Sequence, residues 1–102
     1  MKERPDLGID SYILTSLMVD LVGHDRRPSA YILYLALVRM TSGLGPVGAS
    51  LQDLATATGL SKTAVQRSVA HLKHRSLVSS RATSATHAPH YQVLSPWRRR
   101  TE

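Results

Sequence analysis

Apolar residues recur along the first half of the chain at helical spacing. Within residues 10–22 they stand three and four positions apart, the pattern of a helix with one buried stripe. They are Ile13, Leu14, Leu17, Met18 and Leu21. Residues 29–41 are apolar on nearly every side, after a proline at position 28 that suits a first helical turn. Such a helix has to be buried all round, so the pattern predicts an N-terminal helix packed on a central one.

Polar residues that can cap helices stand at the expected helix ends. Asp10 or Ser11 can cap the first helix. Ser50 and Asp53, three residues later, have the spacing of a capping box, in which each side chain accepts from the other residue's backbone amide. This pair predicts a third helix over residues 50–57.

A fourth helix is predicted over residues 61–75, after a sharp turn. Gly59 can take a positive φ without steric cost, which allows the turn. Ser61 can cap the helix with its hydroxyl. The inner stripe of this helix follows at positions i, i+4 and i+7, at Val65, Val69 and Leu72.

The last third of the chain changes from helical to β spacing. Residues 78–81 and 91–94 predict two strands of a hairpin across 77–95, since the segment between them is small and polar. A short strand is also expected around Val47, after a glycine-rich turn. The expected fold class is therefore mainly α with a small β hairpin, with a three-helix core plus an N-terminal helix.

Residues 54–69 resemble the helix-turn-helix of bacterial winged-helix regulators. MarR-type and GntR-type repressors are similar, as are winged-helix domains of plasmid and phage replication proteins. Ala55 matches the small residue where the two helices touch, Gly59 the turn glycine, and Val65 the buried residue six positions later. The likeness implies a winged helix-turn-helix that binds double-stranded DNA.

The likeness extends over about residues 28–94 and departs at Ser76, where the family usually has a glycine. It implies that the hairpin is the wing. We expect one winged helix-turn-helix domain over residues 1–102, with an arm and helix at 1–27, the core at 28–95 and a basic tail at 96–102. Trp97 can anchor this tail to the domain.

The charge distribution sharpens this picture. The formal net charge is +6, and residues 1–42 hold five basic and five acidic residues, which cancel. Residues 43–102 hold eight basic residues against two acidic ones, and residues 54–101 contain no acid at all. A surface that faces a polyanion has this composition.

The predicted helix at 61–75 carries most of the candidate DNA contacts, because an α-helix fits the major groove. Arg67 on its outer face can read guanine through two hydrogen bonds, and Gln66 can read adenine. The amides at the helix start favour phosphate. Together with one arginine of the hairpin, the candidate DNA-binding residues are Ser61, Lys62, Thr63, Gln66, Arg67, His71, His74 and Arg81.

The sequence gives little support for an enzyme active site or a metal site. The chain has no Cys, which excludes disulfides, thiolate zinc sites and cysteine nucleophiles. Two histidine pairs, His71 with His74 and His87 with His90, have a spacing found in metal sites, but few acids are present to complete a coordination shell. No nucleophile elbow, P-loop or H-E-x-x-H motif occurs. We expect no enzyme activity, no metal and no cofactor.

The two N-terminal helices show more apolar positions than one small core can use. These positions are Ile13, Leu17, Met18, Leu21, Tyr31, Tyr34 and Leu35. Because such patches are rarely left in water, we expect a twofold homodimer through these helices. No apolar run approaches the about 20 residues of a membrane span, so a cytoplasmic protein without membrane contact is expected.

The sequence thus predicts sequence-specific binding of double-stranded DNA by a transcriptional regulator. Two alternatives stay open: a winged-helix module for protein–protein contact, and a plasmid or phage replication or partition factor. The DNA target, the choice between repression and activation, and any small effector are not specified by the sequence.

Overall fold

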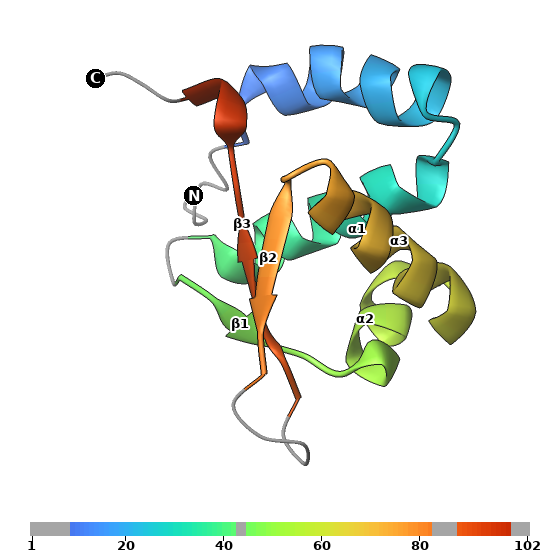
Figure 1. The fold of residues 1–102 in the computed structure, drawn as a ribbon, viewed down its shortest axis with the longest axis vertical. Helices are drawn as coiled ribbons and strands as arrows, with labels where there is room; N and C mark the ends of the chain where they lie inside the picture. The colour runs from blue at the N-terminus through green and yellow to red at the C-terminus, as the bar shows by residue number, and fades with distance from the viewer. Residues whose placement is uncertain (1–8, 43–44, 83–87, 99–102) are drawn as a thin grey trace, which may run out of the picture.

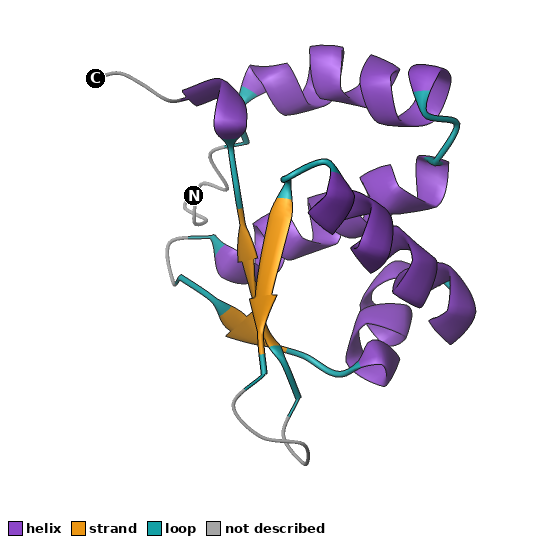
Figure 2. Cartoon of the chain, viewed as in Figure 1, coloured by secondary structure: helices purple, strands orange, loops and turns teal. Residues whose placement is uncertain are grey.

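A computed structural model describes residues 9–42, 45–82 and 88–98 (Figure 1). Helices make up most of this part of the chain, and a small antiparallel sheet completes it (Figure 2). The coarse prediction of a mainly helical chain with a small β part is confirmed. The predicted positions of His87 and of the arginines at 99 and 100 lie outside the described residues.

The N-terminal helix is π-helical, where an α-helix over 10–22 was predicted. It consists of η1 (Ile13–Leu17) and η2 (Val19–His24), joined at Met18. Backbone hydrogen bonds of a π-helix run between residues i and i+5, so each turn is wider than in an α-helix. The residues that reach the core stand four apart, at Ile13, Leu17 and Leu21.

The second helix, α1 (Pro28–Thr41), is the centre of the molecule. In Figure 1 it crosses behind the sheet, with the N-terminal helix on one side and the other two helices on the other. Its tyrosines tie these parts together. Tyr31 donates a 2.8 Å hydrogen bond to the carbonyl of Ile13, and Tyr34 donates a 2.9 Å bond to the carbonyl of Leu94.

The core of this one chain takes up most of the apolar residues that were expected to face a second copy. Five of the seven are buried, at Ile13, Leu17, Leu21, Tyr31 and Tyr34. The inference that these five exceed the needs of one core was wrong. The row of Ile13, Leu17 and Leu21 joins the same core cluster as the two tyrosines of α1, so one chain encloses all five.

Two shorter helices follow, α2 (Leu51–Thr58) and α3 (Lys62–His74). Each agrees with its predicted range of 50–57 or 61–75 to within one residue. Leu54 of α2 and Val65 and Leu72 of α3 are fully enclosed. Both helices pack on α1.

Three short strands form the sheet: β1 (Val47–Gly48), β2 (Val78–Arg81) and β3 (His90–Val93). Their order is β1-β3-β2, and both pairings are antiparallel. The predicted hairpin is therefore present, and the strand expected around Val47 joins it as the third member.

Alternate residues of the strands face opposite sides of the sheet, as the pleat requires. The inner face lies on α1 and is formed by Val47, Val78, Ser80, Tyr91 and Val93. Burial raises the pKa of the Tyr91 hydroxyl. The outer face is formed by Gly48, Ser79, Arg81, His90 and Gln92. The sheet is thus apolar towards the core and polar towards solvent.

A clamp holds the two ends of the described chain together. Asp10 caps the N-terminal helix, since its Oδ1 accepts from the amide of Tyr12 at 3.0 Å. Its Oδ2 accepts from Trp97 Nε1 at 2.9 Å, and the Trp97 ring stacks on Tyr12 with 4.5 Å between ring centroids. The predicted anchoring by Trp97 is confirmed.

Candidate nucleic-acid interface

Local hydrogen bonds fix the pair of helices α2 and α3 as the sequence predicted. The amide of Asp53 donates to Ser50 Oγ at 3.0 Å, and the amide of Ser50 donates to Asp53 Oδ2 at 2.9 Å. This capping box starts α2. The bond from the Ser50 backbone holds the pKa of the Asp53 carboxyl below its usual value.

The turn between the helices depends on Gly59, whose φ is 81°, and its amide donates to Ala55 O at 2.8 Å. Only glycine takes this left-handed conformation without a steric cost. Two residues later, Ser61 Oγ accepts from the amide of Ala64 at 3.0 Å and caps α3. The direction of α3 relative to α2 therefore follows from a few local contacts.

The two sides of α3 differ sharply. One side is buried and consists of Val65, Ser68, Val69 and Leu72. The other is exposed and consists of Lys62, Thr63, Gln66, Arg67, Ala70, Lys73 and His74. The described chain from Leu54 onwards contains no acid, so the exposed side carries only cationic and neutral side chains.

The structure brings five of the eight predicted site residues onto one surface. Lys62 and Thr63 lie exposed in the first turn of α3, next to the capping Ser61. Gln66 and Arg67 follow on the same exposed side. His74 is also exposed, at the last residue of the helix.

His71 lies apart from this surface. Its side chain is 19% exposed, and its Nε2 donates to Asp25 Oδ2 at 2.8 Å. It therefore faces the turn before α1 rather than the open side of α3. Sequence reasoning placed His71 at the margin of the outer face, and a partner 46 positions away in the chain turns it inward.

Asp25 is the centre of a network of charges in that turn. Its carboxylate is 6% exposed and also accepts from His24 Nδ1 at 2.9 Å. Arg75 approaches it to 3.6 Å and lies equally far from Asp20. The hydrogen bond from His24, then that from His71 and the charge of Arg75, lower the pKa of Asp25 against the opposing effect of burial. The network stabilises the ionised carboxylate.

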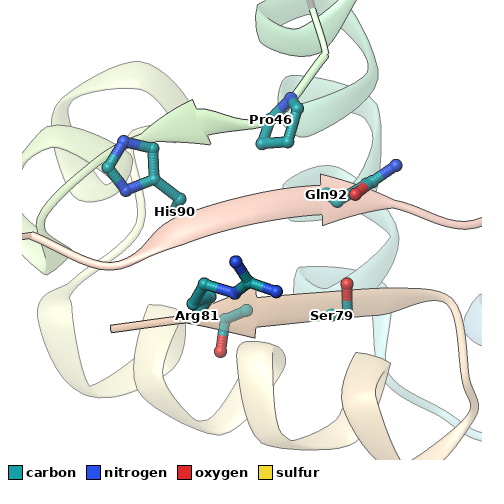
Figure 3. Close-up of a pocket in the computed structure, with 6 residues that line it drawn as sticks. Pro46, Ser79, Arg81, His90 and Gln92 are labelled. Carbon is teal, nitrogen blue, oxygen red and sulfur yellow. The ribbon is translucent and has the colours of Figure 1, made fainter. Parts of the chain in front are cut away.

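Arg81 lies on the outer face of the sheet, opposite His90 of the neighbouring strand. Figure 3 shows both side chains at a hollow that Ser79, Gln92 and the proline before β1 also line. The His90 ring covers Gly48, where an added Cβ would come within 3.2 Å of it. Most of the residues that line the hollow have polar side chains, and Arg81 supplies a permanent positive charge.

Sequence reasoning missed two arginines beside α3. Arg26 and Arg27 lie next to Arg67, around a hollow of about 140 Å³ between the first turn of α1 and the exposed side of α3. The available signal was the pair of arginines directly before a proline at a helix start. What the sequence did not show was that α3 would pack against this turn.

Within residues 9–42, 45–82 and 88–98, no group of three His, Asp or Glu side chains could hold a metal ion. In the same part of the chain, no helix has the length and apolar character needed to cross a membrane.

The chain matches no protein-family model, no curated protein and no solved structure. Its function has therefore to be inferred from the chemistry of its own surface.

Proposed function

We propose that this chain is a winged helix-turn-helix protein that binds double-stranded DNA and regulates transcription. The observation that carries the proposal is the exposed side of α3, where Lys62 and Arg67 have no acidic partner among the described residues. Such a surface favours a polyanion, because its field has no internal counter-charge.

The geometry of α2 and α3 supports insertion of α3 into the major groove. The helix α3 has 13 residues and is buried on only one side. An α-helix is narrow enough to enter this groove, where base edges can be distinguished. The β2–β3 hairpin corresponds to the wing of the resembling proteins, and Arg81 on its outer face would contact the DNA backbone.

The proposed contacts divide into two roles. Arg67 and Gln66, in the middle of the exposed side, read base edges. Ser61, Lys62 and Thr63, at the start of α3, hold phosphate, since amides and the helix dipole favour an anion there. Phosphate contacts position the protein, and base contacts specify the sequence.

A titration of labelled duplex at several salt concentrations tests this proposal. Arg67→Ala should cost about 1–3 kcal/mol on the preferred site and relax the preference at one position. Lys62→Ala should weaken all duplexes alike and reduce the salt slope by about 1. Arg39→Ala is the matched control, because Arg39 is an exposed arginine in the last turn of α1.

The same titration can overturn the proposal. If the wild type binds no duplex even at low salt, the DNA-binding reading fails. A winged-helix module for protein contact would then be the better account, and neither variant would differ from the control.

We also propose that the protein is a homodimer, through apolar residues that the core leaves exposed. Leu14, Met18 and Val22 stand four apart on η1 and η2 and are 48%, 39% and 39% exposed. Ile32 of α1 adds to them at 42%. Apolar rows of this kind are seldom left in water.

Sedimentation at micromolar concentration tests the dimer. Met18→Glu should convert it to a monomer, because a charge would be buried in the contact. The control Ser16→Glu places the same charge on η1 outside the row. A wild type that is monomeric throughout would contradict the prediction. If it is a dimer, DNA half-sites should lie about 34–36 Å apart.

A further inference from the structure

The hollow between the first turn of α1 and α3 is lined by a buried polar side chain that has no hydrogen-bond partner among the described residues. Ser68 is 4% exposed, yet its hydroxyl makes no hydrogen bond within the described residues, and it lines this hollow. Buried hydroxyls are nearly always hydrogen-bonded, so an exception needs an explanation. A ligand that accepts a hydrogen bond from Ser68 supplies one.

The other groups around the hollow are cations and helix-start donors. Arg26, Arg27 and Arg67 line it, and none of them pairs with an acid in the described chain. The nearest acid in sequence, Asp25, is already engaged by its own three partners. The hollow therefore has an uncompensated positive charge.

The start of α1 adds a backbone amide. Proline at position 28 has no N–H, and the amides of Ala30 and Tyr31 donate to the carbonyl of Arg27. The amide of Ser29 makes no such bond among the described residues, and Ser29 also lines the hollow. Free amides at a helix start, together with the helix dipole, favour an anion.

We propose that this hollow, which we call the Arg27–Ser68 site, binds a phosphate group. The ligand oxygens would accept from Ser68 Oγ, the Ser29 amide and the guanidinium groups of the arginines, whose planar donors fit phosphate. The hollow has a volume of about 140 Å³, and a water molecule takes up about 30 Å³ in the liquid. It therefore has room for a tetrahedral oxyanion.

Two sources have this chemistry: a phosphate of a nucleic-acid backbone, and a free phosphate or small phosphate ester. The proposal concerns the shared group and does not require that the protein bind DNA. In the first case, the turn before α1 would extend the DNA contact beyond α3. In the second, a small anion would sit beside Arg67.

The first test is a titration of backbone amide and arginine Nε–H signals with inorganic phosphate, at constant ionic strength set by chloride. We expect saturable shifts at Ser29, Ser68 and the Arg27 side chain. Ser68→Ala should weaken binding roughly threefold to tenfold, the usual range for one hydrogen bond. Arg27→Gln should weaken it at least as much, because a charge-assisted bond is lost.

Matched controls separate the site from general charge. Arg39→Gln removes an equal charge at the other end of α1 and should leave phosphate binding unchanged. Ser68→Ala breaks no hydrogen bond of the described protein and suits a helix, so it should fold as well as the wild type. Shifts that do not saturate, or that Ser68→Ala leaves unaltered, would overturn the site.

A second set of titrations with a short duplex of arbitrary sequence distinguishes the sources. If the duplex displaces phosphate from Ser29 and Ser68, the group belongs to the DNA backbone. If phosphate binds and the duplex leaves those signals unchanged, the ligand is a free phosphate. If phosphate binds and no duplex does, the site stands while the proposed function fails. If the duplex binds equally to wild type and Ser68→Ala and phosphate does not bind, the function stands and the site fails.

Discussion

Two parts of α3 meet the same short turn, residues 24–27, with opposite balances of charge. In the middle of the helix, Arg67 lies beside Arg26 and Arg27, and no acid compensates them in the described chain. Towards the C-terminal end, His71 and the capping residue Arg75 contact Asp25. The difference separates two uses of positive charge. Compensated cations hold α3 to the domain, and uncompensated cations remain for an external anion.

The turn makes this separation possible because its neighbouring residues point to different parts of α3. The side chain of Asp25 is 6% exposed, so its charge has to be paired where it lies. Arg26, directly after it, has a φ of 56° and lines the hollow on the other side. A left-handed residue costs an arginine about 1–2 kcal/mol. This strain at Arg26 lies between Asp25, whose charge is paired, and the arginines that have no acidic partner in the described chain.

The largest expected effect on the free energy of unfolding comes from removing the charge of Asp25. Asp25→Asn should destabilise the protein at pH 7 by about 2–3 kcal/mol, because it removes the buried anion that His71 and Arg75 contact. Asp20→Asn is the matched control. Asp20 contacts the same arginine but is 45% exposed, so its loss should cost about 0–1 kcal/mol. Urea unfolding measures both.

The pH dependence of the stability difference between wild type and Asp25→Asn shows whether charge causes it. The pKa of Asp25 is lowered from 3.8, so the carboxylate contributes stability above this value and loses it as the pH falls through the folded-state pKa. The gap between wild type and Asp25→Asn should therefore narrow below about pH 4. A gap of the same size at pH 7 and pH 3 would show that packing, not charge, is lost.

The smallest expected effect on stability is at Ser76, directly after Arg75. Ser76 has a φ of 59°, at the position where the resembling family usually has a glycine. Ser76→Gly should relieve the strain and stabilise the protein by about 0.5–1 kcal/mol, after allowing for the greater freedom of glycine when unfolded. Ser79→Gly, in an ordinary strand conformation, should instead destabilise it. Duplex binding should not change in Ser76→Gly, since Ser76 follows the C-terminal end of α3 and lies outside the exposed side that carries Lys62 and Arg67.

The helices α2 and α3 could be predicted closely because their signals are local. The Ser50 capping box, the Gly59 turn and the Ser61 cap each act over three or four residues, and each is confirmed. The departure at Ser76 was also visible in the sequence, and its physical meaning is the positive φ.

What the sequence did not reveal depends on contacts between distant residues. The π-helical turns of η1 and η2 place Leu17 and Leu21 in the core, and helical periodicity alone does not distinguish this from a dimer face. The pairing of His71 with Asp25 spans 46 positions. The cluster around Ser68 likewise forms only when α3 packs on the start of α1.

The strand order has a consequence for how the chain folds. β3 is last in sequence but central in the sheet, so β1 and β2 have no strand partner until it docks. The bond from Tyr34 to Leu94 closes 60 positions, and that from Trp97 to Asp10 closes 87. Such closures lose chain entropy before any contact compensates for it. We therefore expect the helical hairpin of α2 and α3 to form early, from local contacts. Docking of residues 90–97 would then be the step that limits the folding rate and makes the transition cooperative.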